Sequence, residues 1–164
     1  GGGPADVVEL TVAAATEMGR RGELNVGQLC RVRFDAQASI VGFGTDHGTV
    51  AAAASWGAPV RTMKVRPAYR DSYERLCHLA EVPAFVLNLR DPARPALRDE
   101  LLAPRLERAI GVIYRPENEL ASHYYGASLP LEFDEYVWLD ETHAVEAMPV
   151  PEVNGPYETF PFGV

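Results

Sequence analysis

Hydrophobic runs broken by turn residues recur along the chain and predict a set of short strands. Apolar residues dominate residues 39–44, 83–89 and 109–114, and each run is bounded by glycine, proline or polar side chains. Such runs predict buried strands, and the near-continuous run at 83–89 is typical of a strand covered on both faces. Residues 60–65 alternate apolar with polar side chains, which indicates a half-exposed strand near a sheet edge. A last strand is predicted at 136–140.

Between these strands, apolar residues follow helical spacing. Asn25 and Ser72 are placed to cap the first two of the predicted helices, and Pro104 interrupts the third. Leu29 and Cys30 share a face that should pack against the sheet. The alternation of strands and helices predicts an α/β fold, with a mostly parallel sheet and helices packed on it. The predicted helices cover residues 26–34, 73–79 and 97–106.

The two ends of the chain differ from its middle. Residues 6–15 suit a strand in their first half, whereas the alanines that follow suit a helix. We therefore treat residues 1–15 as an atypical N-terminal segment and residues 149–164 as a proline-rich tail. The chain has 164 residues, which is enough for one domain with a substantial core, and we expect one domain.

Charge and cysteine content narrow the possible partners. The net charge of -8 opposes binding to phosphate backbones and to anionic membranes, so neither nucleic acid nor membrane is an expected partner. No apolar run reaches the roughly 18 residues that cross a bilayer, and we expect a cytoplasmic protein. Cys30 and Cys77 have no metal-type spacing and are predicted to be buried thiols. No metal or other cofactor is predicted.

The stretch 39–50 is the most informative for chemistry, because a strand there runs into glycines and small polar side chains. Its glycines permit close backbone approach or a positive φ, so the loop can present Thr45, Asp46 and His47 without bulky neighbours. An imidazole takes a proton from water near neutral pH, and a carboxylate can orient it. A tight turn with a surface histidine explains the same pattern.

Several sequence motifs occur in a consistent order over residues 16–148. The main motifs are Thr16-Glu-Met-Gly-Arg-Arg-Gly-Glu-Leu-Asn, Val41-Gly-Phe-Gly-Thr, Ser72-Tyr-Glu-Arg-Leu-Cys-His, Pro104-Arg-Leu-Glu-Arg-Ala-Ile-Gly-Val-Ile-Tyr-Arg-Pro-Glu, Ser122-His-Tyr and Phe133-Asp-Glu-Tyr-Val-Trp. An ordered series of motifs is more specific than any single one. In these motifs the chain resembles the C-terminal half of the erythromycin esterase family, which includes macrolide-hydrolysing enzymes of antibiotic resistance.

The resemblance implies an α/β hydrolase of unusual topology, in which histidines and glutamates activate a water that attacks a small-molecule ester or lactone without a bound metal. The chain shows no Gly-x-Ser-x-Gly nucleophile elbow. Family members carry a His-Asn-x-His run where this chain has residues 10–15, and the family's N-terminal half is not in the sequence. We therefore expect a partial site, inactive unless an N-terminal segment or a second copy completes it. The alternative is a non-catalytic remnant that binds a small molecule or associates with itself.

Candidate site residues follow from these arguments, and each also has a purely structural explanation. Guanidinium groups supply paired donors for a carboxylate, but Arg20 and Arg21 also fit a solvated charged loop. His123 can simply bond buried backbone, and a large aromatic residue such as Trp56 is more often core than pocket. The catalytic candidates are His47, Glu17 and His123. The substrate-binding candidates are Arg20, Arg21, Thr45, Asp46 and Trp56.

Overall fold

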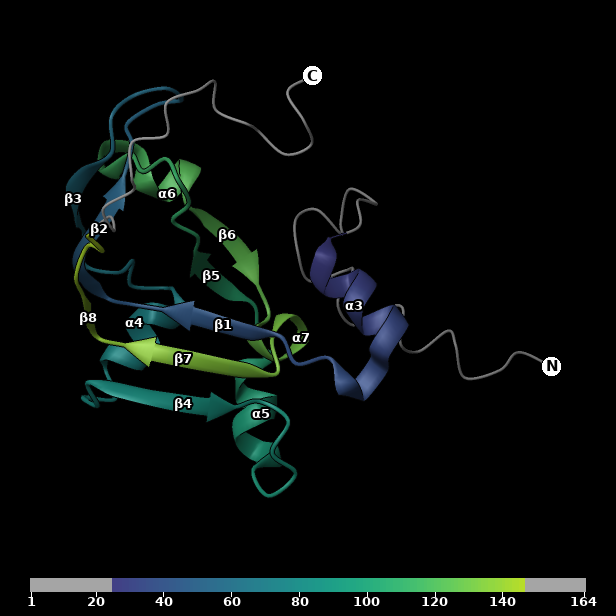
Figure 1. Ribbon diagram of the computed structural model, residues 1–164. Coiled ribbons are helices and arrows are strands. Elements are labelled where there is room, and N and C mark those ends of the chain that lie inside the picture. The colour runs from purple at the N-terminus through teal and green to yellow at the C-terminus, as the bar shows by residue number, and fades with distance from the viewer. Residues whose placement is uncertain (1–24, 147–164) are drawn as a thin grey trace.

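The computed structural model describes residues 25–146, and Figure 1 shows how its elements are arranged. Its helices are α3 (Val26–Phe34), α4 (Tyr73–His78), α5 (Pro95–Leu101), α6 (Glu119–Ser122) and α7 (Leu129–Glu132), with 3-10 turns η1 (Asp35–Gln37) and η2 (Pro116–Asn118). Its strands are β1 (Val41–Gly44), β2 (His47–Ala52), β3 (Arg61–Val65), β4 (Ala84–Asn88), β5 (Arg105–Arg108), β6 (Tyr124–Ala127), β7 (Glu135–Leu139) and β8 (Glu141–Thr142).

The strands form small mixed sheets, so the prediction of an α/β fold is confirmed but that of a mostly parallel sheet is wrong. In the first sheet, ordered β1-β7-β4, β7 runs parallel to β1 and antiparallel to β4. In the second, ordered β3-β2-β8, β2 is antiparallel to β3 and parallel to β8. The third is the antiparallel pair β5-β6. Short connections such as that from β2 to β3 contain no crossover helix, and they favour antiparallel pairing.

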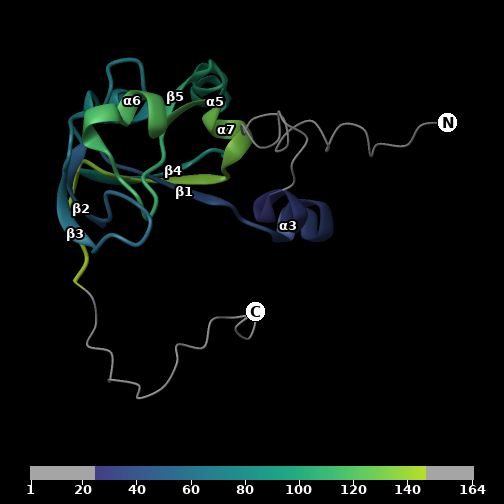
Figure 2. The same ribbon diagram turned by 90° about the horizontal axis from the view of Figure 1, so that it is seen from above.

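The β1-β7-β4 sheet buries one face only. On that face Tyr136 and Trp138 are fully buried, whereas Phe43 is 69% exposed and Val86 is 64% exposed on the other. Figure 2 shows α5, α6 and α7 on one side of this sheet and no described helix over the other. The prediction that residues 83–89 are covered on both faces is therefore wrong, because outward positions of β4 meet no packing layer.

Both helix starts predicted from capping residues are confirmed. The Asn25 side chain accepts a hydrogen bond from the Gln28 N–H at 2.8 Å, and Ser72 accepts one from the Arg75 N–H at 3.2 Å. The expected packing of α3 is wrong, however, since Leu29 is 51% exposed and Gln28 is the buried residue of the helix. Helix α3 lies beyond the start of β1, on the side away from its arrowhead, as Figure 1 shows.

Residues 95–114 differ most from the prediction. Helix α5 ends at Leu101, before Pro104, and the following strand is β5 rather than residues 109–114. Of the predicted strand only Ile113 forms a β-bridge, with Ala53. The expected edge strand at 60–65 is confirmed as β3. Of the two thiols, Cys77 is buried as expected and Cys30 is half-buried.

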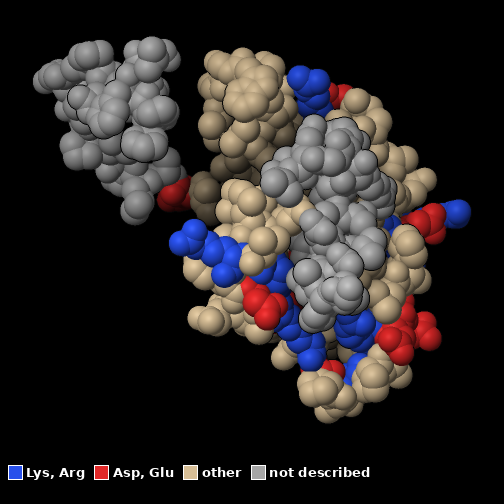
Figure 3. Space-filling model, turned by 90° about the vertical axis from the view of Figure 1, so that its right-hand side faces the viewer, with Lys and Arg blue, Asp and Glu red and all other residues tan. Residues whose placement is uncertain are grey.

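The core lies between the first sheet, α4, α5 and the β6–α7 segment. No helix of residues 25–146 is long and apolar enough to cross a membrane. On the face in Figure 3, basic and acidic side chains are interspersed rather than separated. The core cluster consists of Tyr73, Cys77, Leu89, Leu101, Ala127, Leu129, Tyr136 and Trp138.

Candidate functional site

The connection from β1 to β2 is held tightly by main-chain bonds. The N–H groups of Asp46 and His47 both donate to the carbonyl oxygen of Asp140, each at 3.2 Å. The Asp46 side chain is 3% exposed, and its Oδ2 lies 3.1 Å from Nδ1 of His47. Gly48 follows with φ of 122°, in the left-handed region that favours glycine. The loop therefore brings the His47 imidazole into contact with the Asp46 carboxylate.

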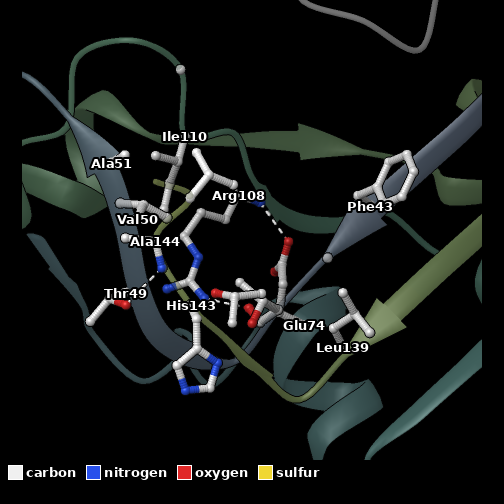
Figure 4. Close-up of a pocket in the computed structure, with 15 residues that line it drawn as sticks. Phe43, Thr49, Val50, Ala51, Glu74, Arg108, Ile110, Leu139, His143 and Ala144 are labelled. Carbon is white, nitrogen blue, oxygen red and sulfur yellow. Dashed lines mark hydrogen bonds between the residues drawn. The ribbon is translucent and has the colours of Figure 1, made fainter. Parts of the chain in front are cut away.

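Beside this connection lies a cavity of about 380 Å³. Figure 4 shows Glu74 and Arg108 between two apolar flanks, with Phe43 and Leu139 on one side and Val50, Ala51 and Ile110 on the other. Such a cavity, mostly apolar with a few polar groups, is typical of small-molecule sites. The remaining lining residues are Gly44, Thr45, Thr49, Gly111, Thr142, His143, Ala144 and Val145.

Glu74 places a buried carboxyl group on the lining of this cavity. It lies in the first turn of α4 and is 1% exposed. One oxygen, Oε1, accepts a hydrogen bond from the Arg108 N–H at 2.7 Å, whereas Oε2 bonds no atom of the described residues. Burial raises the pKa of Glu74 above its ordinary value, even though the bond from Arg108 opposes that change. A carboxyl with a raised pKa can give or take a proton nearer neutrality.

Arg108 holds the loop in place rather than offering its charge to a ligand. Its Nη1 donates to Glu119 Oε1 at 3.0 Å and to the Arg66 carbonyl at 2.8 Å. Its Nη2 donates to the carbonyl oxygens of Thr45 and Asp46. The Arg108 and Glu119 side chains are 2% and 7% exposed, respectively. This buried ion pair ties β5 and α6 to the connection between β1 and β2.

Two further carboxyls lie near Glu74 inside the molecule. Glu107 and Glu132 are 3% and 5% exposed, and the Tyr125 hydroxyl lies 2.9 Å from one and 3.0 Å from the other. Burial raises the pKa of Glu107 well above its ordinary value, and the neighbouring Glu132 and Glu74 raise it further. Three buried acidic side chains thus lie near one another, of which Glu74 lines the cavity, and one proton on them relieves their mutual repulsion.

The structure brings together only some of the predicted site residues. Thr45 lines the cavity, while Asp46 and His47 pair with each other just outside the lining. Trp56 is 83% exposed and lies outside the lining as well. Glu17, Arg20 and Arg21 fall outside the described residues, and so do residues 1–15 and 149–164.

His123 lies away from the Asp46–His47 pair and contacts main-chain groups. Its Nε2 accepts a hydrogen bond from the Arg115 N–H at 3.0 Å, and its Nδ1 lies 3.3 Å from the Ala109 carbonyl oxygen. Its ring also packs against that of Tyr114, with 5.2 Å between the ring centroids. This environment is that of a histidine that fixes the loop before η2.

Sequence reasoning did not single out Glu74, Arg108 or His78. Glu74 and His78 share a face of α4 at a spacing of four residues, and that face is the buried one on which Cys77 also lies. An acidic residue on the apolar face of a helix indicates a possible functional site, because burying a carboxyl costs free energy unless it is hydrogen-bonded or paired. His78 Nδ1 lies 2.6 Å from Asp140 Oδ1. No sequence pattern predicts that His78 and Asp140 are in contact.

Fold and site together define a mixed α/β domain in which the buried carboxyl of Glu74 lines a cavity of small-molecule size. The chain belongs to the erythromycin esterase family, whose family model matches residues 10–142. It is also similar in structure to a succinoglycan biosynthesis protein, with a TM-score of 0.60, 19% identity, and coverage of 79% of this chain and 30% of that one. A protein from Bacillus cereus gives a TM-score of 0.60 at 15% identity, covering 71% of this chain and 28% of that one. The chain thus spans less than a third of the length of either structure.

Proposed function

We propose that this chain supplies part of a site that hydrolyses an ester or lactone by means of an activated water, as the family name suggests. The observation that carries the proposal is the buried carboxyl of Glu74 on the lining of the cavity. Since its pKa is raised by burial, this group can exchange a proton with water or with a leaving alcohol. The apolar flanks of the cavity favour the hydrocarbon part of a small ester over a highly charged substrate.

The same observations support a site that is incomplete in this chain alone. His143 and Glu74 are the imidazole and the carboxyl that line the cavity within the described residues. Both terminal nitrogens of Arg108 already donate to protein acceptors, which leaves little of its hydrogen-bonding capacity for the negative charge that develops on a carbonyl oxygen. Hydrolysis needs both an activated water and such stabilisation, and we infer that groups beyond residues 25–146 provide the rest.

A binding and turnover assay tests this proposal. We expect the purified chain to bind a macrolide lactone saturably in calorimetry, with no turnover of lactones or p-nitrophenyl esters above buffer. Gly111→Phe should abolish binding, because the space beside this lining residue is open and a phenyl ring would fill the cavity. Ala54→Phe adds the same ring at an exposed position outside the lining and should bind as the unaltered chain does.

The outcomes separate the parts of the proposal. If the unaltered chain shows no saturable binding, the cavity is not a substrate site. Turnover that Glu74→Gln removes would support hydrolysis at this cavity but would contradict the inference that the chain is inactive alone. Turnover that Glu74→Gln does not change would leave Glu74 without a chemical role.

A non-catalytic module that associates with itself is the second candidate, and the exposed face of the first sheet favours it. Val41, Phe43, Val86 and Leu139 are all on this face and are between 39% and 69% exposed. Contiguous apolar surface of this kind often marks an interface. If two copies associate through it, Phe43→Ser should shift the chain to monomer in sedimentation velocity. Thr62→Ser, at an exposed position on β3, should leave the distribution unchanged.

A further inference from the structure

Two imidazoles and two carboxylates converge just outside the cavity lining, at a place that the proposed hydrolysis does not use. Asp46 Oδ2 lies 3.1 Å from His47 Nδ1 and 3.7 Å from His78 Nδ1. Asp140 Oδ1 lies 2.6 Å from the same nitrogen of His78. The two rings are edge to face, with 6.3 Å between their centroids. We call these four residues the His–Asp cluster.

Main-chain bonds fix the cluster from three parts of the fold. Asp46 and His47 lie at the start of β2, His78 ends α4, and Asp140 lies between β7 and β8. The Asp140 carbonyl oxygen accepts the N–H bonds of both Asp46 and His47, and β8 pairs with β2 from His47 onward. The donors are therefore held in position before any ligand arrives, which lowers the cost of binding one.

The geometry points to a binding site for a transition-metal cation of the Zn²⁺ class: we propose that Asp46, His47 and His78 ligate such an ion. One potential ligand atom from each of these residues lies within 4.8 Å of the other two. Bonds of about 2.0–2.2 Å in a tetrahedron place ligand atoms about 3.3–3.6 Å apart. The observed separations of 3.1 and 3.7 Å lie close to that range.

The donor types decide the kind of cation. Two imidazole nitrogens with one carboxylate suit Zn²⁺, Ni²⁺ or Cu²⁺, whereas Mg²⁺ and Ca²⁺ prefer sites made of oxygen alone. The His47 and His78 side chains are 37% and 32% exposed, so solvent can reach the ion and complete its coordination. Asp140, with a side chain that is 28% exposed and an oxygen 2.6 Å from His78 Nδ1, lies close enough to offer a fourth oxygen.

The positive side chains nearby leave one Asp46 oxygen available for this role. Oδ1 accepts the Ala68 N–H at 3.2 Å and lies 3.7 Å from Nη1 of Arg75. Oδ2 instead faces the two imidazoles. Arg108 bonds the Asp46 main-chain carbonyl rather than the carboxylate. The two oxygens therefore divide their tasks, one holding the loop to the protein and the other pointing toward the proposed ion.

Calorimetric titration of the metal-free chain with ZnCl₂ at pH 7.5 tests the inference. We expect saturable binding that MgCl₂ does not compete for. His47→Ala and His78→Ala should each weaken Zn²⁺ binding by roughly tenfold or more. Loss of a residue that only hydrogen-bonds a metal ligand already costs about tenfold in affinity, and loss of the ligand itself should cost at least as much. His143→Gln changes an exposed imidazole outside the cluster and should bind as the unaltered chain does. Co²⁺ should give the visible absorption of a tetrahedral site in the unaltered chain but not in His78→Ala.

Three results would overturn the inference: no saturable binding, equal competition by Mg²⁺, or unchanged affinity in both histidine variants. Circular dichroism of each variant guards against loss of fold, and His47, which is more exposed than His78, is the variant to rely on if His78→Ala unfolds. None of these measurements depends on hydrolysis, so the cation site and the proposed function can fail separately.

Discussion

Replacing Arg108 by methionine is expected to lower the free energy of unfolding by about 3–5 kcal/mol, the usual cost of removing one partner from a buried ion pair. The side chain is 2% exposed, and its loss leaves the carboxylate of Glu119 buried without its cation. The carbonyl oxygens of Thr45, Asp46 and Arg66 lose their donor in the same step. Methionine keeps most of the apolar volume, so the loss reports on charge and hydrogen bonding. Urea denaturation followed by circular dichroism measures it.

The matched control is Arg70→Met. The Arg70 side chain is 85% exposed and its ion pair with Asp71, at 3.3 Å, lies on the surface. Exposed pairs contribute about 0–1 kcal/mol, so this variant should unfold close to the unaltered chain. If Arg108→Met also costs less than about 1 kcal/mol, the guanidinium does not hold the connection between β1 and β2 in place.

The second large effect is expected at Gly48, where alanine should cost about 2–5 kcal/mol. A Cβ at this position would lie 2.1 Å from the Thr142 carbonyl oxygen, a main-chain atom that cannot move without separating β8 from β2. The backbone φ of 122° adds strain for any residue with a side chain. The thermal unfolding temperature should fall accordingly, and the neighbouring His47 should leave the His–Asp cluster.

Gly111→Ala provides the comparison for that result. A Cβ at Gly111 meets nothing within 4 Å, and its φ lies outside the left-handed region. Alanine there should leave stability unchanged or raise it by up to about 1 kcal/mol, since it restricts the unfolded chain. Equal unfolding temperatures for the two alanine variants would show that β2 and β8 can separate enough to accommodate a methyl group at little cost.

The sequence predicted those parts of the fold that depend on residues close together in the chain. Asn25 and Ser72 mark their helix starts because a cap is a bond between residues three apart. Sheet order could not be found in the same way, because it depends on pairing between distant segments. The apolar run at 83–89 shows the limit, since the same pattern fits a strand with two covered faces and one that leaves Val86 exposed.

Part of the candidate site was also visible in the sequence. The glycines around Thr45, Asp46 and His47 indicated a loop that presents polar groups, and the imidazole does contact the carboxylate. The remainder of the His–Asp cluster was hidden, because His78 and Asp140 come to this loop only through the packing of α4 and the turn after β7. The same holds for Glu74, whose carboxyl meets the β5 backbone through tertiary contact alone.

The middle strand of the first sheet, β7, is the last of its three strands to be synthesised. Both β1 and β4 hydrogen-bond to β7, and the adjoining contact between Ile40 and Asp134 joins residues 94 positions apart. During synthesis these two strands must therefore wait, unpaired and partly apolar, until nearly the whole described region has left the ribosome. Closing so long a loop slows folding, and unpaired edges invite association between nascent chains. A stop codon before residue 135 would thus yield an aggregating product rather than a smaller folded one.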